Sequence, residues 1–117
     1  MIDGKSSRIL ACAIPVNVFC YIWEFDVRPE HQAEFEAAYG PAGDWARLFR
    51  RDPGYLRTDL LRNRADLTRF LTVDFWITRE ACEAFRARHA SEFRVLDEKC
   101  ERLTVSERHL GDFEVLE

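Results

Sequence analysis

Two adjacent strand-like segments constrain the fold of this chain more than any other feature. Residues 55–63 (YLRTDLLRN) and 69–77 (RFLTVDFWI) are rich in branched and aromatic side chains, and only a short polar stretch separates them. Segments of this kind, placed so close together, are typical of an antiparallel β-hairpin. The second segment carries Asp74 and, two residues later, Trp76, so we expect both side chains on the same face of the sheet.

The two faces of the hairpin indicate its register. If Arg64 opposes Leu67, one face is nearly all apolar and contains the pairs Leu60–Leu71, Thr58–Val73 and Leu56–Phe75. The other face then contains the pairs Tyr55–Trp76, Arg57–Asp74 and Asp59–Thr72. The alternative register mixes the two faces, so we predict the first one. In this register Asp74 is either the ion-pair partner of Arg57 in an interface or part of a site.

Further strands and helices are predicted on both sides of the hairpin. Residues 18–27 (VFCYIWEFDV) alternate as a strand does, and Pro29 suits the start of a helix with the apolar stripe Phe35, Ala38 and Tyr39. Asp44 is a predicted cap for a short second helix, on which one side carries Trp45, Leu48 and Phe49. Thr78 is a predicted cap for a long helix with the apolar stripe Phe85, His89, Phe93, Leu96, Cys100 and Leu103. An irregular strand around Gly111 follows.

The element order predicts the fold class. The order β-α-β-β-α-β is that of a ferredoxin-like α+β fold, in which helices cover one face of an antiparallel sheet. We predict an arm or an extra strand at residues 1–17 and one domain at residues 18–117, since 117 residues suffice for a single core. The uncovered face then mixes charges with Tyr55, Leu61, Phe70 and Trp76. Because monomers rarely expose so much aromatic surface, we predict a homodimer that packs sheet against sheet.

Charge and cysteine spacing exclude several classes of function. The formal net charge is −4, so no basic field favours nucleic acid or an anionic membrane surface. The apolar stretch after Arg8 is short and contains Pro15, so we predict neither a membrane span nor a signal peptide. The four cysteines are widely spaced and lack the spacing of zinc ligands. We therefore predict reduced, mostly buried thiols in a cytoplasmic protein, and no metal site.

Three segments of the chain resemble a known family. The segments YIWEFDVRPE, PGYLRTDLL and FLTVDFWITREACEAF look like those of the antibiotic biosynthesis monooxygenase (ABM) domain family, over about residues 18–115. The resemblance implies a dimeric α+β barrel. The family includes cofactor-independent oxygenases of aromatic polyketides, quinol monooxygenases, haem-degrading enzymes and members with no known reaction. For an oxygenase of the first kind the resemblance implies no cofactor.

The functional residues of these relatives carry over only in part. The polyketide oxygenases place an Asn four residues before the strand-end Trp and a Tyr six residues after it. The strand-end Trp is Trp76 here, but the other two positions hold Thr72 and Cys82. The haem-degrading branch places a Trp and a ligand His at the positions of Phe85 and Val95, and neither residue type matches. The resemblance therefore disfavours haem degradation.

The face that carries Asp74 has side chains suited to cofactor-free oxygenation. A phenol or quinol that loses a proton becomes an anion that can pass an electron to oxygen. Asp74 is the candidate base, because burial near aromatic rings would raise the pKa of its carboxyl group. Trp76 could stack on a flat substrate, and Thr72 could hydrogen-bond to it. For Asp74 an ion pair, and for Trp76 packing, stay open as structural alternatives.

The flanking elements supply the other candidate site residues. His89 lies on the apolar stripe of the long helix, as a core histidine or as a general acid or base, and we group it with Asp74 and Trp76 as catalytic. The predicted substrate-binding group contains Thr72, Tyr21, Trp23, Cys82 and Phe85. Tyr21 and Trp23 share one face of the first strand, where core packing is the alternative, and Cys82 lies near a helix start that would favour a thiolate.

The sequence thus supports two hypotheses of function. The first is a cofactor-independent monooxygenase, an oxidoreductase, acting on an aromatic or quinol-like small molecule. The alternative is a non-catalytic dimeric module that binds a small ligand or serves in a stress response. A cavity that reaches Thr72, Asp74 and Trp76 would support a ligand in either case.

Overall fold

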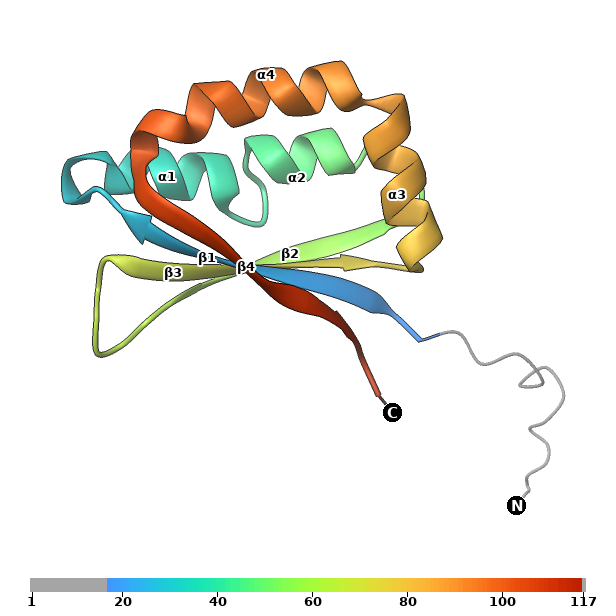
Figure 1. The fold of residues 1–117 in the computed structure, drawn as a ribbon, viewed down its shortest axis with the longest axis horizontal. Coiled ribbons are helices and arrows are strands. Elements are labelled where there is room, and N and C mark those ends of the chain that lie inside the picture. The colour runs from blue at the N-terminus through green and yellow to red at the C-terminus, as the bar shows by residue number, and fades with distance from the viewer. Residues whose placement is uncertain (1–16, 117) are drawn as a thin grey trace, which may run out of the picture.

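A four-stranded antiparallel sheet with helices on one face forms the body of the protein (Figure 1). The computed structural model describes residues 17–116, so the predicted arm, apart from Asn17, lies outside the described residues. The strands are β1 (Phe19–Val27), β2 (Tyr55–Arg62), β3 (Arg69–Trp76) and β4 (Thr104–Glu114). The helices are α1 (Gln32–Tyr39), α2 (Asp44–Phe49), α3 (Arg79–Arg88) and α4 (Ala90–Cys100), with short 3₁₀ turns η3 (Pro29–His31) and η4 (Glu101–Leu103). The predicted β-α-β-β-α-β order and the ferredoxin-like class are confirmed.

The strand order β2-β3-β1-β4 places β1 and β3 at the centre of the sheet. β3 alternates between buried and half-buried positions along its whole length, and β1 does so at its last three residues, so one face packs under the helices and the other remains open. In Figure 1, α1, α2 and α4 lie over the sheet, and α3 lies at one end of it. The central strands therefore present their inward side chains to the helices along their whole length.

Local signals account for the helix ends. Pro29 occupies the first turn of η3, where its missing N–H costs no hydrogen bond. The Thr78 side chain accepts a hydrogen bond from Ala81 N at 3.0 Å, so the predicted cap of α3 is confirmed. The predicted cap of α2 is wrong, because Gly43 is the capping residue and Asp44 is the first residue of the helix.

The predicted long amphipathic helix is two helices. The helical conformation is interrupted at His89, which has φ −115° and ψ 30° and lies between α3 and α4. The apolar stripe survives the break, since Phe85 is buried on α3 and Cys100 is buried on α4. The break lets α3 cover the end of the sheet while α4 runs over α2 (Figure 1).

The predicted hairpin register is correct only at its open end. Tyr55 opposes Trp76 as predicted, but an irregularity between Tyr55 and Arg57 shifts the rest of β2 by one residue. Thr58, not Arg57, therefore opposes Asp74. The predicted Arg57–Asp74 ion pair is wrong: the guanidinium group of Arg57 pairs with Asp59 at 3.2 Å.

The helices also cover the opposite face of β3 from the one predicted. Phe70, Trp76 and Tyr55 were expected on the uncovered face but are buried under the helices. The open face instead carries Leu61, which is exposed, together with the half-buried side chains of Ile22, Leu71, Val73 and Phe75. The apolar character of the open face is therefore retained, although most of its members differ from those predicted.

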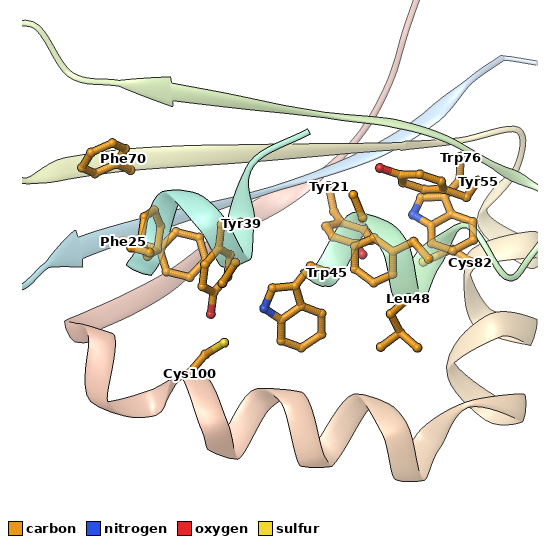
Figure 2. Close-up of a cluster of buried hydrophobic side chains, with 14 of the residues drawn as sticks. Tyr21, Phe25, Tyr39, Trp45, Leu48, Tyr55, Phe70, Trp76, Cys82 and Cys100 are labelled. Carbon is orange, nitrogen blue, oxygen red and sulfur yellow. The ribbon is translucent and has the colours of Figure 1, made fainter. Parts of the chain in front are cut away.

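An aromatic core fills the layer between sheet and helices, as Figure 2 shows. Trp76, Phe35 and Phe85 are almost fully buried, and neighbouring rings of the buried core meet at 4.4–6.2 Å between centroids. Cys20, Cys82 and Cys100 are buried free thiols, as predicted for the described cysteines. Within residues 17–116, no helix has the length and apolar character needed to span a membrane.

Candidate functional site

A cavity of about 190 Å³ lies between the helix-covered face of the sheet and the helices above it. The central strands supply Tyr21, Trp23, Phe25, Thr72 and Asp74 to its wall. The helices and β4 supply Tyr39, Trp45, Phe49, Arg86, Phe93, Asp97 and Glu107. Most of this lining is aromatic, so the cavity suits a flat apolar molecule.

Asp74 is the acid buried most deeply in this wall. Its side chain points under the helices because β3 alternates, and only 6 % of the residue is exposed. The Thr58 hydroxyl donates a hydrogen bond to Asp74 Oδ1 at 2.5 Å, and the Tyr55 hydroxyl lies 2.7 Å from the same Thr58 oxygen. The shifted register of β2 creates this chain of hydroxyl groups, since it places Thr58 opposite Asp74.

Burial changes the acidity of Asp74. Loss of hydration raises the pKa of the carboxyl group to about 7, while the Thr58 hydrogen bond and the positive charge of Arg86 act in the opposite direction. A carboxyl group with such a pKa is partly ionised near neutral pH and can take up a proton there. The cavity therefore contains a proton acceptor poised for acid–base chemistry, surrounded by aromatic rings.

The tyrosines of the cavity remain protonated. Burial raises the pKa of Tyr21 well above its usual value, and the charge of Asp74, its cross-strand neighbour, raises it further. Burial likewise raises the pKa of Tyr39. Both hydroxyl groups can therefore donate hydrogen bonds at neutral pH but cannot act as bases.

Two buried indole N–H groups lack a hydrogen-bond partner among the described residues. They belong to Trp45, which lines the cavity, and to Trp76, which does not. Figure 2 shows the Trp45 nitrogen on the side of the ring that faces Tyr39 and Cys100. Trp45 therefore directs its N–H towards the Tyr39 hydroxyl group and the Cys100 thiol at one end of the cavity.

The structure brings four of the predicted site residues together. Tyr21, Trp23, Thr72 and Asp74 all line the cavity, and Tyr21 pairs with Asp74 as Trp23 pairs with Thr72 across β1 and β3. The signal was the alternation of the two strands, which placed each pair of residues on one face. Of the three side chains expected to reach a cavity, Thr72 and Asp74 line it and Trp76 does not.

Trp76 and Phe85 lie behind the cavity. Trp76 is 0 % exposed and packs against Tyr55, Phe49 and Phe85 at 5.3–5.7 Å between ring centroids. Neither Trp76 nor Phe85 is part of the lining. In this arrangement both rings support the wall that holds Asp74.

Cys82 and His89 also lie outside the lining. Burial raises the pKa of the Cys82 thiol to about 11, so the expected thiolate is not favoured. The His89 ring packs on Phe85 at 5.0 Å between centroids, and its Nδ1 lies 3.7 Å from a carboxylate oxygen of Glu92. His89 therefore marks the junction of α3 and α4 and makes its contacts away from Asp74.

Three charged residues of the cavity were not predicted from the sequence: Arg86, Asp97 and Glu107. Arg86 lies four residues after Cys82 and seven before Phe93, so it belongs to the face of the apolar stripe, and this position was a usable signal. Asp97 lies four residues after Phe93 and carries the same signal. Glu107 lies on β4, where two irregularities in the pairing with β1 obscure the alternation.

The described residues hold no arrangement suited to a metal ion. Within residues 17–116, no group of three or more His, Cys, Asp or Glu side chains is close enough to share one.

Comparison with known proteins gives one family and several similar structures. The model of the antibiotic biosynthesis monooxygenase family matches residues 18–94. SnoaB of Streptomyces nogalater, described as a cofactor-independent oxygenase, is 24% identical with a TM-score of 0.70, over 86% of this chain and 95% of its own. Two further structures named after the same family show the same fold, with TM-scores of 0.69 and 0.70. The first, from Bordetella bronchiseptica, is 20% identical over 86% of this chain and 98% of its own. The second, from Caulobacter crescentus, is 15% identical over 87% and 92%.

No curated protein matches the chain in sequence. The solved structures therefore show similarity of fold, and the family model shows similarity of sequence over residues 18–94.

Proposed function

Because the chain belongs to the antibiotic biosynthesis monooxygenase family, we propose that it is a cofactor-independent monooxygenase of a small, flat aromatic compound of the quinol or anthrone kind. One observation carries the proposal: a buried carboxyl group with a pKa of about 7 lies in the wall of an aromatic cavity. Fold and family alone would not support an activity.

The proposed reaction begins with proton transfer to Asp74. The ionised carboxylate takes a proton from an acidic C–H or O–H group of the substrate and leaves a delocalised anion. This anion gives one electron to dioxygen, and the resulting radical and superoxide combine to form a C–O bond. For an anthrone-like CH₂ group, the peroxide takes one proton back and loses water, so CH₂ and O₂ become C=O and H₂O.

The cavity supports each step through its surroundings. Aromatic walls exclude water and hold a planar ring system in one orientation. Thr58 fixes the Asp74 carboxyl group by donating to Oδ1, which leaves the other oxygen for the substrate proton. The charge of Arg86 favours negative charge at this end of the cavity, whether it resides on Asp74 or on the substrate anion.

We further propose that the protein is a homodimer that pairs through the open face of the sheet. The support is an apolar band across three strands, formed by Leu61, Leu71, Val73, Phe75 and Ile22. Such a band on a small domain is typical of an interface between subunits.

Oxygen uptake tests the proposed activity. The purified protein is mixed with a panel of anthrones and hydroquinones, and oxygen consumption is followed with an electrode. We expect uptake with at least one compound, and a decrease of roughly 100-fold or more in kcat for Asp74→Asn, because the variant lacks the proton acceptor. The matched control is Asp59→Asn, which removes an equal charge from β2 at a residue that pairs with Arg57 and should retain activity.

Two results would contradict this activity. The first is uptake that is unchanged in Asp74→Asn. The second is binding of aromatic compounds without any uptake, which would favour the non-catalytic ligand-binding module. The replacement of the family's Asn and Tyr by Thr72 and Cys82, with Cys82 outside the cavity, is the observation that favours that second function.

A further inference from the structure

The cavity has two ends of different charge. At one end Asp74 lies close enough to Arg86 for the guanidinium group to lower its pKa. At the other end Asp97 of α4 and Glu107 of β4 line the wall. Glu107 opposes Phe25 on β1, whereas Asp74 opposes Tyr21, so four residues of β1 separate the two ends. This separation corresponds to roughly 13 Å along the strand.

The two carboxylates of the far end lack a cation. Neither Asp97 nor Glu107 forms an ion pair with any residue in the described part of the chain, whereas Asp74 has Arg86 nearby. Burial and the negative charges of Asp97 and Glu101 raise the pKa of Glu107. Like charges thus repel one another at this end, and a positive charge placed between them would be stabilised.

Aromatic rings form the rest of this end. Tyr39 packs on Phe25 at 4.8 Å and lies 6.0 Å from Trp45, and Trp45 meets Phe93 at 4.9 Å between ring centroids. Trp23 stacks with Phe25 at 6.4 Å. Figure 2 shows Tyr39, Trp45 and Phe25 gathered between the sheet and α4. The faces of such rings attract cations, and cages of aromatic rings recognise ammonium groups in many proteins.

From these contacts we propose that the acidic aromatic end binds a protonated amino or quaternary ammonium group of the substrate. The inference rests on the proposed function, because it assigns the substrate of that reaction to the class of aminated aromatic compounds. The ammonium group lies between Asp97 and Glu107, over the rings of Tyr39 and Trp45. The reacting carbon then lies at the other end, beside Asp74.

The charges of the cavity favour a cation over an anion at this end. Three carboxyl groups and one guanidinium group line the cavity, so carboxylates outnumber cations in its wall; the guanidinium group, that of Arg86, lies over the Phe93 ring at 4.7 Å and forms an ion pair with neither Asp97 nor Glu107 within the described residues. An anionic substituent at the far end would meet Asp97 and Glu107 without a compensating charge. A neutral substituent would leave the repulsion between the two carboxylates unchanged.

Binding of two matched probes tests the inference. 1-Naphthylmethylamine is protonated at pH 7, and 1-naphthalenemethanol has nearly the same shape without the charge. Calorimetric titration at low salt should show that the wild-type protein binds the amine at least about tenfold more tightly than the alcohol. In Asp97→Asn/Glu107→Gln the amine should lose about tenfold in affinity, and the alcohol should bind as before.

A second double variant serves as the control. Glu83→Gln/Glu98→Gln removes the same number of charges from exposed positions of α3 and α4 that do not line the cavity. It should keep the preference for the amine. Thermal unfolding of all variants verifies that the proteins are folded under the conditions of the titration.

The outcomes separate this inference from the proposed activity. Equal affinity for the two probes, no binding of either probe, or a preference that persists in Asp97→Asn/Glu107→Gln overturns the inference. The probes need not react, so a protein that consumes no oxygen but prefers the amine keeps the binding site and loses the monooxygenase activity. A protein that consumes oxygen with neutral anthrones but does not prefer the amine has the monooxygenase activity without the ammonium site.

Discussion

Asp74 lies in surroundings that disfavour the ionised form of its carboxyl group. It lies in a central strand, under aromatic rings, with one hydroxyl donor from Thr58 and one distant cation, Arg86. These groups only partly replace the lost hydration, and the pKa of the carboxyl group is therefore raised from 3.8 to about 7. At this scale the sequence indicated Asp74 as the candidate base but placed it on the uncovered face, whereas the structure buries it under the helices.

The raised pKa predicts how stability depends on pH. The folded protein binds the Asp74 proton more tightly than the unfolded chain, so the free energy of unfolding should fall as pH rises from about 4 to about 7 and level off above. In Asp74→Asn this contribution is absent, and the variant should be more stable than the wild type at pH 8 by roughly 4 kcal/mol. Urea unfolding at pH 4.5, 6 and 8 measures the effect.

The difference between the two proteins isolates Asp74 from other titrating groups. Asp59→Asn, on the strand opposite, should follow the wild-type curve at all three pH values. Parallel curves for the wild type and Asp74→Asn would show that the carboxyl group is ionised at its ordinary pKa.

At the scale of elements, the sequence predicted the order of strands and helices but not their irregularities. The hairpin was expected to turn tightly, yet six residues connect β2 to β3. The Asn63 side chain accepts hydrogen bonds from the backbone N–H groups of Ala65 and Asp66 at 2.7 and 3.0 Å. Asn is typical of such turns, so its position was a signal for the wider loop.

Other irregularities have no comparable signal. The shift between Tyr55 and Arg57 and the break at His89 involve neither Gly nor Pro. Both depend on how the elements pack, as when α3 turns to cover Trp76 at the end of the sheet. Thr58 and Glu107 could not be assigned to the site for this reason, whereas Tyr21 and Trp23 could, since side chains two residues apart in one strand point to the same face.

The contact between the start of β2 and α3 leads to a prediction on packing. A Cβ atom at Gly54 would lie 2.5 Å from the Ala81 Cβ, so no side chain fits there. Gly54→Ala should lower the free energy of unfolding by about 1–3 kcal/mol through this overlap. Chemical denaturation of Gly54→Ala, Ala81→Gly and the double variant measures the coupling.

The double variant provides the critical comparison. Ala81→Gly alone should cost about 1 kcal/mol or less in the first turn of α3. Together with Gly54→Ala it should remove the overlap, so the double variant should be more stable than the sum of the single effects predicts. Strict additivity would mean that the two residues do not touch in the folded protein.

At the scale of the whole molecule, the helices protect one face of the sheet and leave the other apolar. The open face is apolar as predicted, but Leu61 is joined there by the odd-numbered residues of β3 instead of the expected aromatic residues. The pattern of the strands indicated an open apolar face, and the packing of the helices decided which side chains of β3 occupy it.

The proposed interface is open to a direct test. Val73 and Ile22 are cross-strand partners near the middle of the open face, so Val73→Glu should place a charge inside the interface and convert a dimer into a monomer. Light scattering after size-exclusion chromatography measures the mass in solution. Val95→Glu, on the exposed surface of α4, should remain dimeric. A wild-type protein that is monomeric at micromolar concentration would exclude the homodimer.

The break at His89 has a consequence for how this architecture can diversify. Arg86 belongs to α3 and stands near the proton acceptor, whereas Asp97 belongs to α4 and stands near the far end of the cavity. Substitution of Asp97 would alter the charge of the far end, and the hydrogen bond from Thr58 to Asp74, which lies within the sheet, would stay fixed. A lineage of such proteins could therefore change its choice of molecule while inheriting one reaction unaltered.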